Sequence, residues 1–421
     1  MSLITYKDIV VGGIKNLHIL ELKIHQKICE HATAQLKIMV EREDGLAYIE
    51  QATEQDLVKI EIRGEIVYVG TVSKMQLSHI EAGSILSLEL ISTSKLLDCT
   101  YRSRSFQRVG ISYSDLMQKA IGTNGLIVSD FSDDSTKGIL IQYQETDWEF
   151  VRRLALKCEA VISPDMKSEQ AVVYVGTAPN SLGFIEQVGS VQDRALIVEV
   201  ESELVRGELL SRVRTAQKGQ ALRDIPSDYI VNPVVGKIFS GVVKAVSMDQ
   251  IQAHIIDIDD EYEEGNWWFP YSTIYSSPQN DAGIYAMPME EETVRLFFPS
   301  EDPAEAFAAS SNNNRELGET GKEKIFTSPD GMGVIFYEGG LKLYNKDKTI
   351  YIDLRADGEV ELRSMQNIEI IAKENMFLNA GEKLCITSEK EVYLGTAQSF
   401  IDLNASNGGT IDMYSSKIFV Q

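Results

Sequence analysis

An apolar pair at positions i and i+2 recurs every eight residues through much of the segment 333–421. Alternation at a period of two residues is typical of a β-strand with one apolar face, and the polar residues between the pairs suit turns and solvent. Pairs at Leu341/Leu343, Ile401/Leu403 and Ile411/Met413 extend the pattern with spacings slightly different from eight. The regular pairs are Ile352 and Leu354, Val360 and Leu362, Ile368 and Ile370, Met376 and Leu378, Leu384 and Ile386, and Val392 and Leu394.

The short repeat limits how such strands can enclose a core. A single chain that winds into a β-helix needs roughly twenty residues for each coil, because several strands must surround the interior. We therefore predict that three copies wind together as a triple-stranded, intertwined β-helix, with the regular pairs on the shared axis of a homotrimer. Cys385 lies between the inward-facing Leu384 and Ile386, so we expect it to face outward.

The alternative is an antiparallel meander of short strands within one chain. A meander does not require strands of constant length, and its corners usually carry Asn-Gly or Asp-Gly. Glycine corners are few here, namely Asp357-Gly358, Ala380-Gly381 and Asn407-Gly408-Gly409. The intertwined trimer is thus the favoured interpretation.

Strand patterns also fill the N-terminal part of the chain. Leu20, Leu22 and Ile24 alternate with other residues, and glycine-containing turn signals such as Asp44-Gly45 separate this run from later ones. These features are typical of closely spaced antiparallel strands. They predict a small antiparallel barrel or sandwich over residues 1 to about 100, within a first domain of residues 1–230 that we call the hub domain.

A change of period within the hub predicts an α/β insertion at about 101–164. Ser114 begins a short helical segment, and a clearer one follows Thr146. Thr146 fits the N-cap position of that helix, and Glu149 fits the third position of a capping box.

Three further regions complete the predicted organisation. Short strands over residues 231–308 indicate a small closed barrel of the OB-fold type. A polar stretch around Ser310–Asn314 indicates a linker over residues 309–332, and the eight-residue repeat then forms a needle over 333–421. The chain is therefore predicted to be mainly β, with β-barrel hub domains, an α/β insertion, an OB-fold domain and a C-terminal β-helix.

Charge changes this picture by excluding some partners. The 421 residues include 63 acidic and 40 basic ones, for a formal charge of −23. Nucleic acids and anionic membrane surfaces attract clustered Lys and Arg, so neither is an expected partner. No apolar run approaches the roughly 20 residues of a membrane span, and the N-terminus lacks the pattern of a signal peptide. We therefore expect the protein to be made and folded in the cytoplasm.

Candidate chemistry is sparse, and we predict no catalytic residue, metal ligand or cofactor. The acidic run Asp257–Glu264 lacks the order of an EF-hand loop and is interpreted as a solvated loop. Cysteines and histidines show no CxxC, HxH or HExxH spacing. They are Cys29, Cys99, Cys158 and Cys385, and His18, His25, His31, His79 and His254.

Residues 141–154, with the sequence IQYQETDWEFVRRL, resemble the Q-Y-x-E-[ST]-D-x-x-F-x-x-R-L signature of a known family. This family comprises the VgrG spike proteins of type VI secretion and the hub and spike proteins of contractile phage tails. The blocks Gly283–Pro288 and Glu292–Phe298 also follow the family's order, although Glu291 stands at a usual glycine and Ile251–Ile255 replace an arginine-rich strand. The matching hub residues are Tyr143, Glu145, Asp147, Phe150, Arg153 and Leu154.

This resemblance implies a non-enzymatic, homotrimeric central spike of a contractile injection system. It also implies that the hub domain contains two small β-barrels, at about 1–100 and 165–230. Such a spike caps the inner tube, contacts baseplate components and pierces the target envelope. It carries a PAAR-type tip protein or an effector cargo, and it leaves the cell as part of the injection particle. Phage tail, tailocin and type VI-like systems all remain open. No histidine follows His254, so a metal-capped tip like that of some relatives is not expected.

Two other functional classes remain open at this point. A phage-type spike enzyme that degrades peptidoglycan or polysaccharide would use carboxylates in the needle or in the acidic run. A carbohydrate-binding tail fibre would favour exposed aromatic side chains along the needle. Tyr351, Phe377 and Tyr393 adjoin the apolar pairs there without forming a regular column.

Overall fold

The computed structural model describes residues 4–14, 18–51, 53, 56–81, 83–131, 134–176, 195–258, 267–277, 282–311, 323–396, 398–404 and 410–414. The chain divides into two compact units, Met1–Asn314 and Arg315–Gln421. Short 3₁₀ helices accompany the larger elements. They are η1 (Tyr6–Asp8), η2 (Thr93–Asp98), η3 (Gly122–Asn124), η4 (Ser227–Tyr229) and η5 (Pro303–Glu305).

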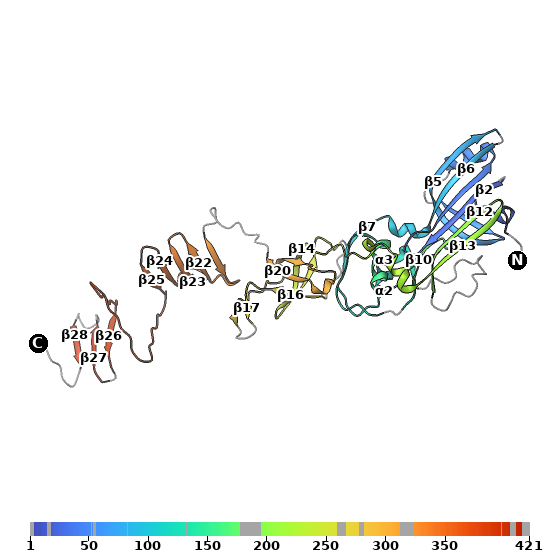
Figure 1. The fold of residues 1–421 in the computed structure, drawn as a ribbon. Helices are drawn as coiled ribbons and strands as arrows, with labels where there is room; N and C mark the ends of the chain where they lie inside the picture. Colours follow the sequence, from blue (N-terminus) through green and yellow to red (C-terminus); the bar gives the residue numbers. More distant parts are fainter. Residues whose placement is uncertain are drawn as a thin grey trace. The chain divides into compact units, whose positions relative to one another are not determined.

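One large sheet dominates the N-terminal part of the first unit (Figure 1). Its eight strands lie in the order β1-β4-β5-β6-β3-β2-β12-β13, and all neighbouring strands are antiparallel. Alternate side chains point into one apolar core, as period-two alternation requires. The strands are β1 (Ile9–Val11), β2 (His18–Lys27), β3 (Thr33–Val40), β4 (Leu57–Ile62), β5 (Glu65–Ile80), β6 (Gly83–Ser92), β12 (Ala195–Val205) and β13 (Glu208–Gln217).

This sheet corrects the prediction of two separate barrels at about 1–100 and 165–230. In the described residues, strands of both regions belong to one sheet, because β12 lies beside β2 with Glu201 opposite His25. Val200 of β12 enters the same core as Leu22 and Ile24 of β2, so the pairing continues a single apolar face. Periodicity in the sequence shows that a strand has an apolar face, but it does not show which neighbour the strand pairs with.

A β-bulge alters the predicted alternation of Leu20, Leu22 and Ile24. The register between β2 and β3 shifts between Ile19 and Glu21. Ile19 and Leu22 are therefore both buried, while Leu20 is partly exposed. An extra residue in one strand has this effect because it reverses the side on which the preceding side chains point.

The predicted turn at Asp44-Gly45 lies inside a helix, α1 (Arg42–Gln51). Gly45 is buried there, and a Cβ atom at this position would lie 2.9 Å from the Cδ1 atom of Leu77 on β5. This glycine therefore permits close packing of α1 on the sheet, whereas the sequence alone suggested a chain reversal.

The α/β insertion contains two helices and a three-stranded sheet in the order β10-β11-β8, in which β8 and β11 are parallel. The predicted capping box is confirmed, since Thr146 Oγ1 accepts from Glu149 N–H at 3.1 Å and Glu149 Oε2 accepts from Thr146 N–H at 2.9 Å. Strands β7 and β9 form a separate antiparallel ribbon. The elements are β7 (Tyr101–Phe106), α2 (Tyr113–Ile121), β8 (Gly125–Asp130), β9 (Leu140–Thr146), α3 (Asp147–Lys157), β10 (Ile162–Pro164) and β11 (Ala171–Gly176).

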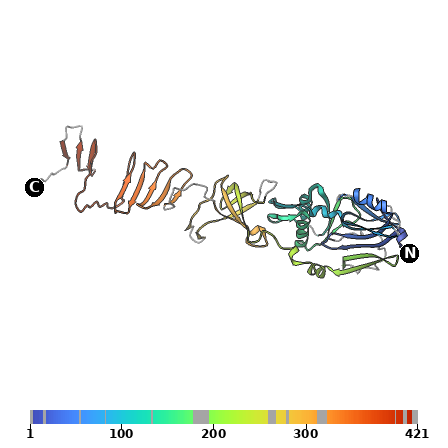
Figure 2. The ribbon, with the colours of Figure 1, turned by 90° about the horizontal axis from the view of Figure 1, so that it is seen from above.

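A closed barrel of five strands completes the first unit, as predicted for the OB-like region. Figure 2 shows it beside the helical part of the hub within that unit. A helix, α4 (Lys218–Arg223), precedes the barrel, and a small hairpin, β17 (Ser276–Ser277) with β18 (Ala282–Gly283), follows its third strand. The barrel strands are β14 (Ile238–Ser247), β15 (Gln250–Ile255), β16 (Trp268–Ser272), β19 (Thr293–Phe297) and β20 (Phe307–Ser311).

The second unit begins with an antiparallel meander of five strands, which we call the base sheet. The segment 309–332 was predicted as a linker. Its first residues belong to strand β20 of the barrel, and residues 324–327 form the first strand of this sheet. Residues 312–322 lie outside the described ones. The base sheet consists of β21 (Lys324–Thr327), β22 (Gly333–Tyr337), β23 (Gly340–Tyr344), β24 (Tyr351–Arg355) and β25 (Val360–Arg363).

Residues 364–390, which we call the shaft segment, differ from the base sheet. They contain no strand, and their backbone bends at 365–366, 373–374, 381–382 and 389–390 follow the eight-residue repeat. No backbone–backbone hydrogen bond joins this segment to any described residue of the chain. A second meander follows, of β26 (Glu391–Gly395), β27 (Phe400–Asn404) and β28 (Thr410–Tyr414).

Two parts of the needle region have the alternative arrangement. Within a single chain, the base sheet and β26–β28 are antiparallel meanders, which was the alternative interpretation. In the base sheet the connections reverse the chain, as the loop Asn345–Ile350 does between β23 and β24. The shaft segment has only its regular bends, and it does not fold back on itself.

Candidate functional site

Strand β9 carries the first part of the hub motif, and its two sides face different hydrophobic cores. Leu140 packs in the core of the α/β insertion, together with Phe106 and Trp148. Ile141 points the opposite way, as does Ile139 just before the strand, and both belong to the core of the five-stranded barrel. A strand of the hub thus contributes side chains to the core of a barrel whose own first strand begins about a hundred residues later.

Further contacts bring this strand against the barrel. The Tyr143 ring lies edge-on to Phe239 of β14, with ring centroids 5.2 Å apart, and Lys237 Nζ lies 4.6 Å from the centre of the same Tyr143 ring. Gly138 approaches the barrel so closely that a Cβ atom there would lie 2.7 Å from the Cβ atom of Ala304. Only a residue without a side chain fits this approach.

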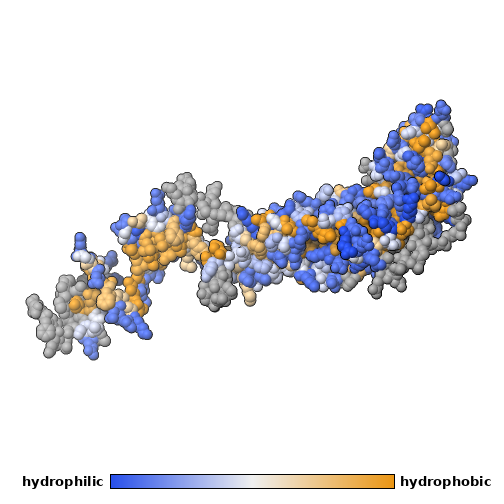
Figure 3. All heavy atoms as spheres, in the orientation of Figure 1, coloured by the Kyte–Doolittle hydropathy of each residue, from blue (hydrophilic) through white to orange (hydrophobic). Residues whose placement is uncertain are grey.

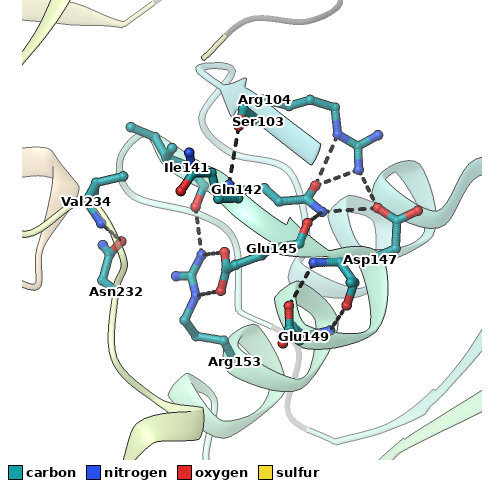
Figure 4. Close-up of polar contacts among 12 residues, drawn as sticks. Ser103, Arg104, Ile141, Gln142, Glu145, Asp147, Glu149, Arg153, Asn232 and Val234 are labelled. Atoms are coloured by element: carbon teal, nitrogen blue, oxygen red, sulfur yellow. Dashed lines mark hydrogen bonds and ion pairs between the residues drawn. The ribbon is translucent and has the colours of Figure 1, made fainter. Parts of the chain in front are cut away.

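A buried ion pair fixes β9 to helix α3 (Figure 4). Arg153 donates to Glu145 through Nε and Nη2, at 2.7 and 2.6 Å, and its Nη2 atom also donates to the Ile141 carbonyl at 2.7 Å. The two side chains are only 7% and 12% exposed. Such a bidentate pair holds its partners in one geometry, and loss of either partner would leave an unpaired charge away from water.

Asp147, the first residue of α3, connects this helix to the β7–β9 ribbon. Its Oδ1 atom accepts from Arg104 Nη2 at 2.8 Å and from Gln142 Nε2 at 3.1 Å. The carboxylate also lies at the helix N-terminus, where the helix dipole favours negative charge. Asp147 is 4% exposed, so the paired arginine compensates for the loss of water around the carboxylate.

The two remaining motif residues fill the hub core. Phe150 is fully buried and stacks on Phe106 with ring centroids 5.4 Å apart, and Leu154 is also fully buried. The six matched residues therefore lie together around β9 and α3, and each has a structural contact. We call β9, α3 and their contacts with the barrel the hub–barrel joint.

Sequence reasoning did not identify Arg104 as a partner of this motif, and it gave Gln142 no role beyond the first position of the signature. The two-sided role of β9 was also not predicted. Its signal was present in the uninterrupted apolar run Ile139–Ile141, because a strand that is buried on both faces lacks alternation.

A largely buried histidine lies beside the joint. His31 stacks on Trp148 with ring centroids 4.2 Å apart, and its ring nitrogens contact Ser94 Oγ at 2.8 Å and Asp98 Oδ2 at 3.3 Å. The other Asp98 oxygen accepts from Thr146 Oγ1, the N-cap of α3, at 2.6 Å. These residues are widely separated in the sequence, so no local pattern could indicate the network. Ser94 is fully buried, which closes this Ser–His–Asp group to a substrate.

We expect His31 to make stability depend on pH. Burial lowers the pKa of His31 below its ordinary value of 6.5, and the nearby Asp98 opposes this shift without cancelling it. The unfolded chain therefore takes up this proton at a higher pH than the folded chain. The stabilising contribution is present above pH 6.5 and is lost as the pH falls toward the lower pKa of the folded state.

Urea unfolding of the wild type and of His31→Gln at pH 7.5 and pH 5.5 measures this effect. The wild type should lose more of its free energy of unfolding over this interval than the variant. An equal loss in both proteins would show that His31 does not titrate with folding.

The predicted axis residues of the needle lie on one face where the structure pairs them. In the base sheet, Ile352 lies opposite Leu362 and Leu354 lies opposite Val360, so the four share one side. Figure 3 shows apolar side chains gathered on the visible face of this sheet. The other face is polar and centres on the buried Asp353, whose carboxylate contacts the Tyr337 hydroxyl at 2.6 Å and Lys342 Nζ at 2.9 Å.

The axis candidates beyond the base sheet are also exposed in the single chain, apart from Val392. Cys385 is exposed as well, so the single chain does not distinguish its side of the needle from that of its neighbours. Val392 in β26 is partly exposed, and Leu394 is exposed. The shaft residues with exposed side chains are Ile368, Ile370, Met376, Leu378, Leu384 and Ile386.

Other candidate chemistry is limited in the part of the chain that the structure describes. No group of three or more His, Cys, Asp or Glu residues there could hold a metal ion. Of the acidic run Asp257–Glu264, residues 259–264 lie outside the described ones, and Asp257 Oδ2 accepts from the Ser240 N–H at 2.6 Å. Among the helices within the same described ranges, none is both long and apolar enough to cross a membrane.

Comparison with known proteins identifies the fold. No family model matches the chain, and no curated protein matches it. A chain of the half-lidded Francisella PdpA–VgrG complex aligns with a TM-score of 0.53 and 8% identity, over 83% of this chain and 84% of that one. The lidless PdpA–VgrG complex gives a TM-score of 0.51 and 8% identity, over 83% and 94%.

A component of the E. coli type VI secretion system, described as similar to the T4 phage tail proteins gp27 and gp5, aligns with a TM-score of 0.49 and 11% identity. The alignment covers 72% of this chain and 99% of that one. At such identities, the likeness concerns the fold alone. The two PdpA–VgrG alignments agree with a sheet followed by an α/β insertion and a closed barrel, and they show that the fold of this chain is similar to that of chains in these VgrG-containing complexes.

Proposed function

We propose that the chain is the central hub and spike of a contractile injection system, and that it acts as a homotrimer without enzymatic activity of its own. The observation that carries this proposal is the shaft segment. Its apolar pairs are exposed and its backbone forms no backbone–backbone hydrogen bond with the described residues, although it follows a regular eight-residue path. The fold of the first unit supports the hub part of the proposal.

The shaft segment needs partners for two physical reasons. Exposed apolar side chains gain free energy when they leave water, at roughly 25 cal/mol for each Å² buried. The exposed fractions are large, at 66% for Ile370 and 62% for Leu378. Backbone N–H and C=O groups are also almost always paired in a folded protein. Two further copies of the segment would satisfy both requirements at once.

The base sheet and the shaft segment would then contribute differently to the trimer. Each base sheet pairs its strands within one chain and would supply one complete side of a three-sided prism, with its apolar face inward. The shaft segments would pair with one another, since each lacks neighbours of its own. A closed arrangement of this kind leaves no free strand edge along the shaft.

This architecture suits a protein that transmits force within the injection particle, rather than an enzyme. The hub would cap the inner tube and contact baseplate components, and sheath contraction would drive the needle through the target envelope. A PAAR-type protein or an effector would occupy the tip as cargo. The solved complexes of VgrG with PdpA support the idea that such spikes carry partner proteins.

The mass of the full-length chain in solution tests the trimer. Light scattering should give three times 47.0 kDa. A monomer would contradict the proposal, and it would favour the alternative of a peptidoglycan- or polysaccharide-degrading enzyme or a sugar-binding fibre.

A disulfide cross-link tests the intertwined shaft directly. Phe377 and Cys385 occupy outward positions in successive repeats, and successive repeats on one side of a three-chain helix come from different chains. Phe377→Cys should therefore form covalent dimers and trimers with Cys385 after mild oxidation. The same variant carrying Cys385→Ser should not form them. Only monomeric chains on a non-reducing gel would contradict the shared shaft.

A further inference from the structure

We propose that the hub–barrel joint makes the hub and the five-stranded barrel one cooperative body, so that force on the hub reaches the barrel without an intervening hinge. This inference rests on the proposed spike function for its biological meaning. The contacts on which it is based all lie within the first unit. They give the 141–154 motif the role of positioning the hub and the barrel relative to each other.

The covalent connection between hub and barrel is anchored on both sides. Chain residues 218–237 lead from β13 to β14, and Ile225 in this stretch enters the hub core. Val234 enters the barrel core, and the Asn232 N–H donates to Glu301 Oε2 at 3.0 Å. Arg152 of α3 lies 3.5 Å from the centre of the Tyr229 ring. A connection held in this way has little freedom to bend.

Strand β9 forms a second, independent connection. Leu140 belongs to one core, and Ile139 and Ile141 belong to the other, so adjacent residues of one strand serve both. The barrel cannot separate from the hub without exposing Ile139 and Ile141 to water. The Gln107 side chain adds a polar contact, since its Nε2 atom donates to the Ala253 carbonyl of β15 at 3.1 Å.

Arg153 holds the part of β9 that touches the barrel. Its guanidinium binds the Ile141 carbonyl and the Glu145 carboxylate, which lie two residues before and two residues after Tyr143. Tyr143 is the residue that packs on Phe239 of the barrel. Helix α3 thus fixes the strand on both sides of this contact. A buried, bidentate pair is well suited to such a role because it tolerates little change of angle.

Hydrogen exchange on the full-length chain tests the inference with two matched variants. Leu140→Ala removes three carbons from the hub core, and Ile141→Ala removes three carbons from the barrel core. If the two domains open as one body, each variant should raise exchange at least tenfold in the most protected amides of both domains, namely those of α3 and those of β14 and β19. Leu126→Ala, at a side chain that is 49% exposed, should leave both sets unchanged.

Independent domains would give a different result. If Leu140→Ala raises exchange in α3 but leaves β14 and β19 unchanged, the inference is wrong. Should Leu140→Ala fail to fold, Leu140→Val provides the same comparison with a smaller loss of volume. The exchange of these amides does not depend on the needle. A monomeric protein with coupled exchange would therefore contradict the proposed spike function and support the rigid hub–barrel joint. A trimer with uncoupled exchange would support the spike function and contradict the rigid joint.

Discussion

Replacing Ile370 by aspartate should abolish the trimer. In the proposed shaft, three copies of residue 370 meet at one level of a dry axis, so Ile370→Asp would bring three carboxylates together without water or counter-charges. Burying even one unpaired carboxylate costs several kcal/mol, and three at one level repel each other as well. We expect a mass of 47.0 kDa by light scattering in place of three times that value. Ile386→Asp should behave in the same way.

The matched control places the same charge on the outer side of the shaft. Phe377 lies between Met376 and Leu378, so its side chain should point away from the axis. Phe377→Asp should leave the trimer intact. A normal trimer in Ile370→Asp would contradict the shared axis, whatever the control shows.

Loss of Arg153 should destabilise the first unit severely. Arg153→Gln would leave the Glu145 carboxylate largely buried and without its ion-pair partner, and it would remove the donor to the Ile141 carbonyl. Breaking a buried pair by removing one partner costs about 3–5 kcal/mol. Urea unfolding followed by tryptophan fluorescence should show a decrease of this size in the free energy of unfolding.

Two comparisons separate the buried charge from other effects. The double variant Glu145→Gln, Arg153→Gln should lose less stability than Arg153→Gln alone, because no unpaired charge then remains. Lys37→Gln breaks an exposed pair with Glu21, and such pairs contribute about 0–1 kcal/mol. If Arg153→Gln lowered the free energy of unfolding no more than Lys37→Gln does, the Arg153–Glu145 ion pair would not be important for holding β9 in place.

Local patterns predicted the elements of this fold better than their partners. The capping box of Thr146 and Glu149 involves residues three apart, and the structure has it as predicted. The five-stranded barrel was also predictable from short apolar runs. The place of β12 in the large sheet was not, because it depends on which apolar face it completes. The bulge near Ile19 likewise depends on pairing with β3, which no single strand reveals.

The candidate site was predictable only in part. Resemblance to a family signature identified Tyr143, Glu145 and Arg153, but it did not show what these residues hold together. That required the fold, because the barrel residue Phe239 lies almost a hundred residues after Tyr143. In the needle, the repeat predicted which side chains share a face. It could not show that loops such as Asn345–Ile350 let the base sheet pair within one chain.

The self-paired base sheet has a consequence for the timing of assembly. Its strands are neighbours in the sequence, and contacts between neighbouring strands form faster than contacts between distant ones. Each newly made chain can therefore complete its base sheet before it meets another chain. In the proposed trimer, three finished sheets would meet first, and the shaft segments would then wind from a common starting point. Chain concentration would limit only that first encounter, and the needle would lengthen from base to tip in a fixed register.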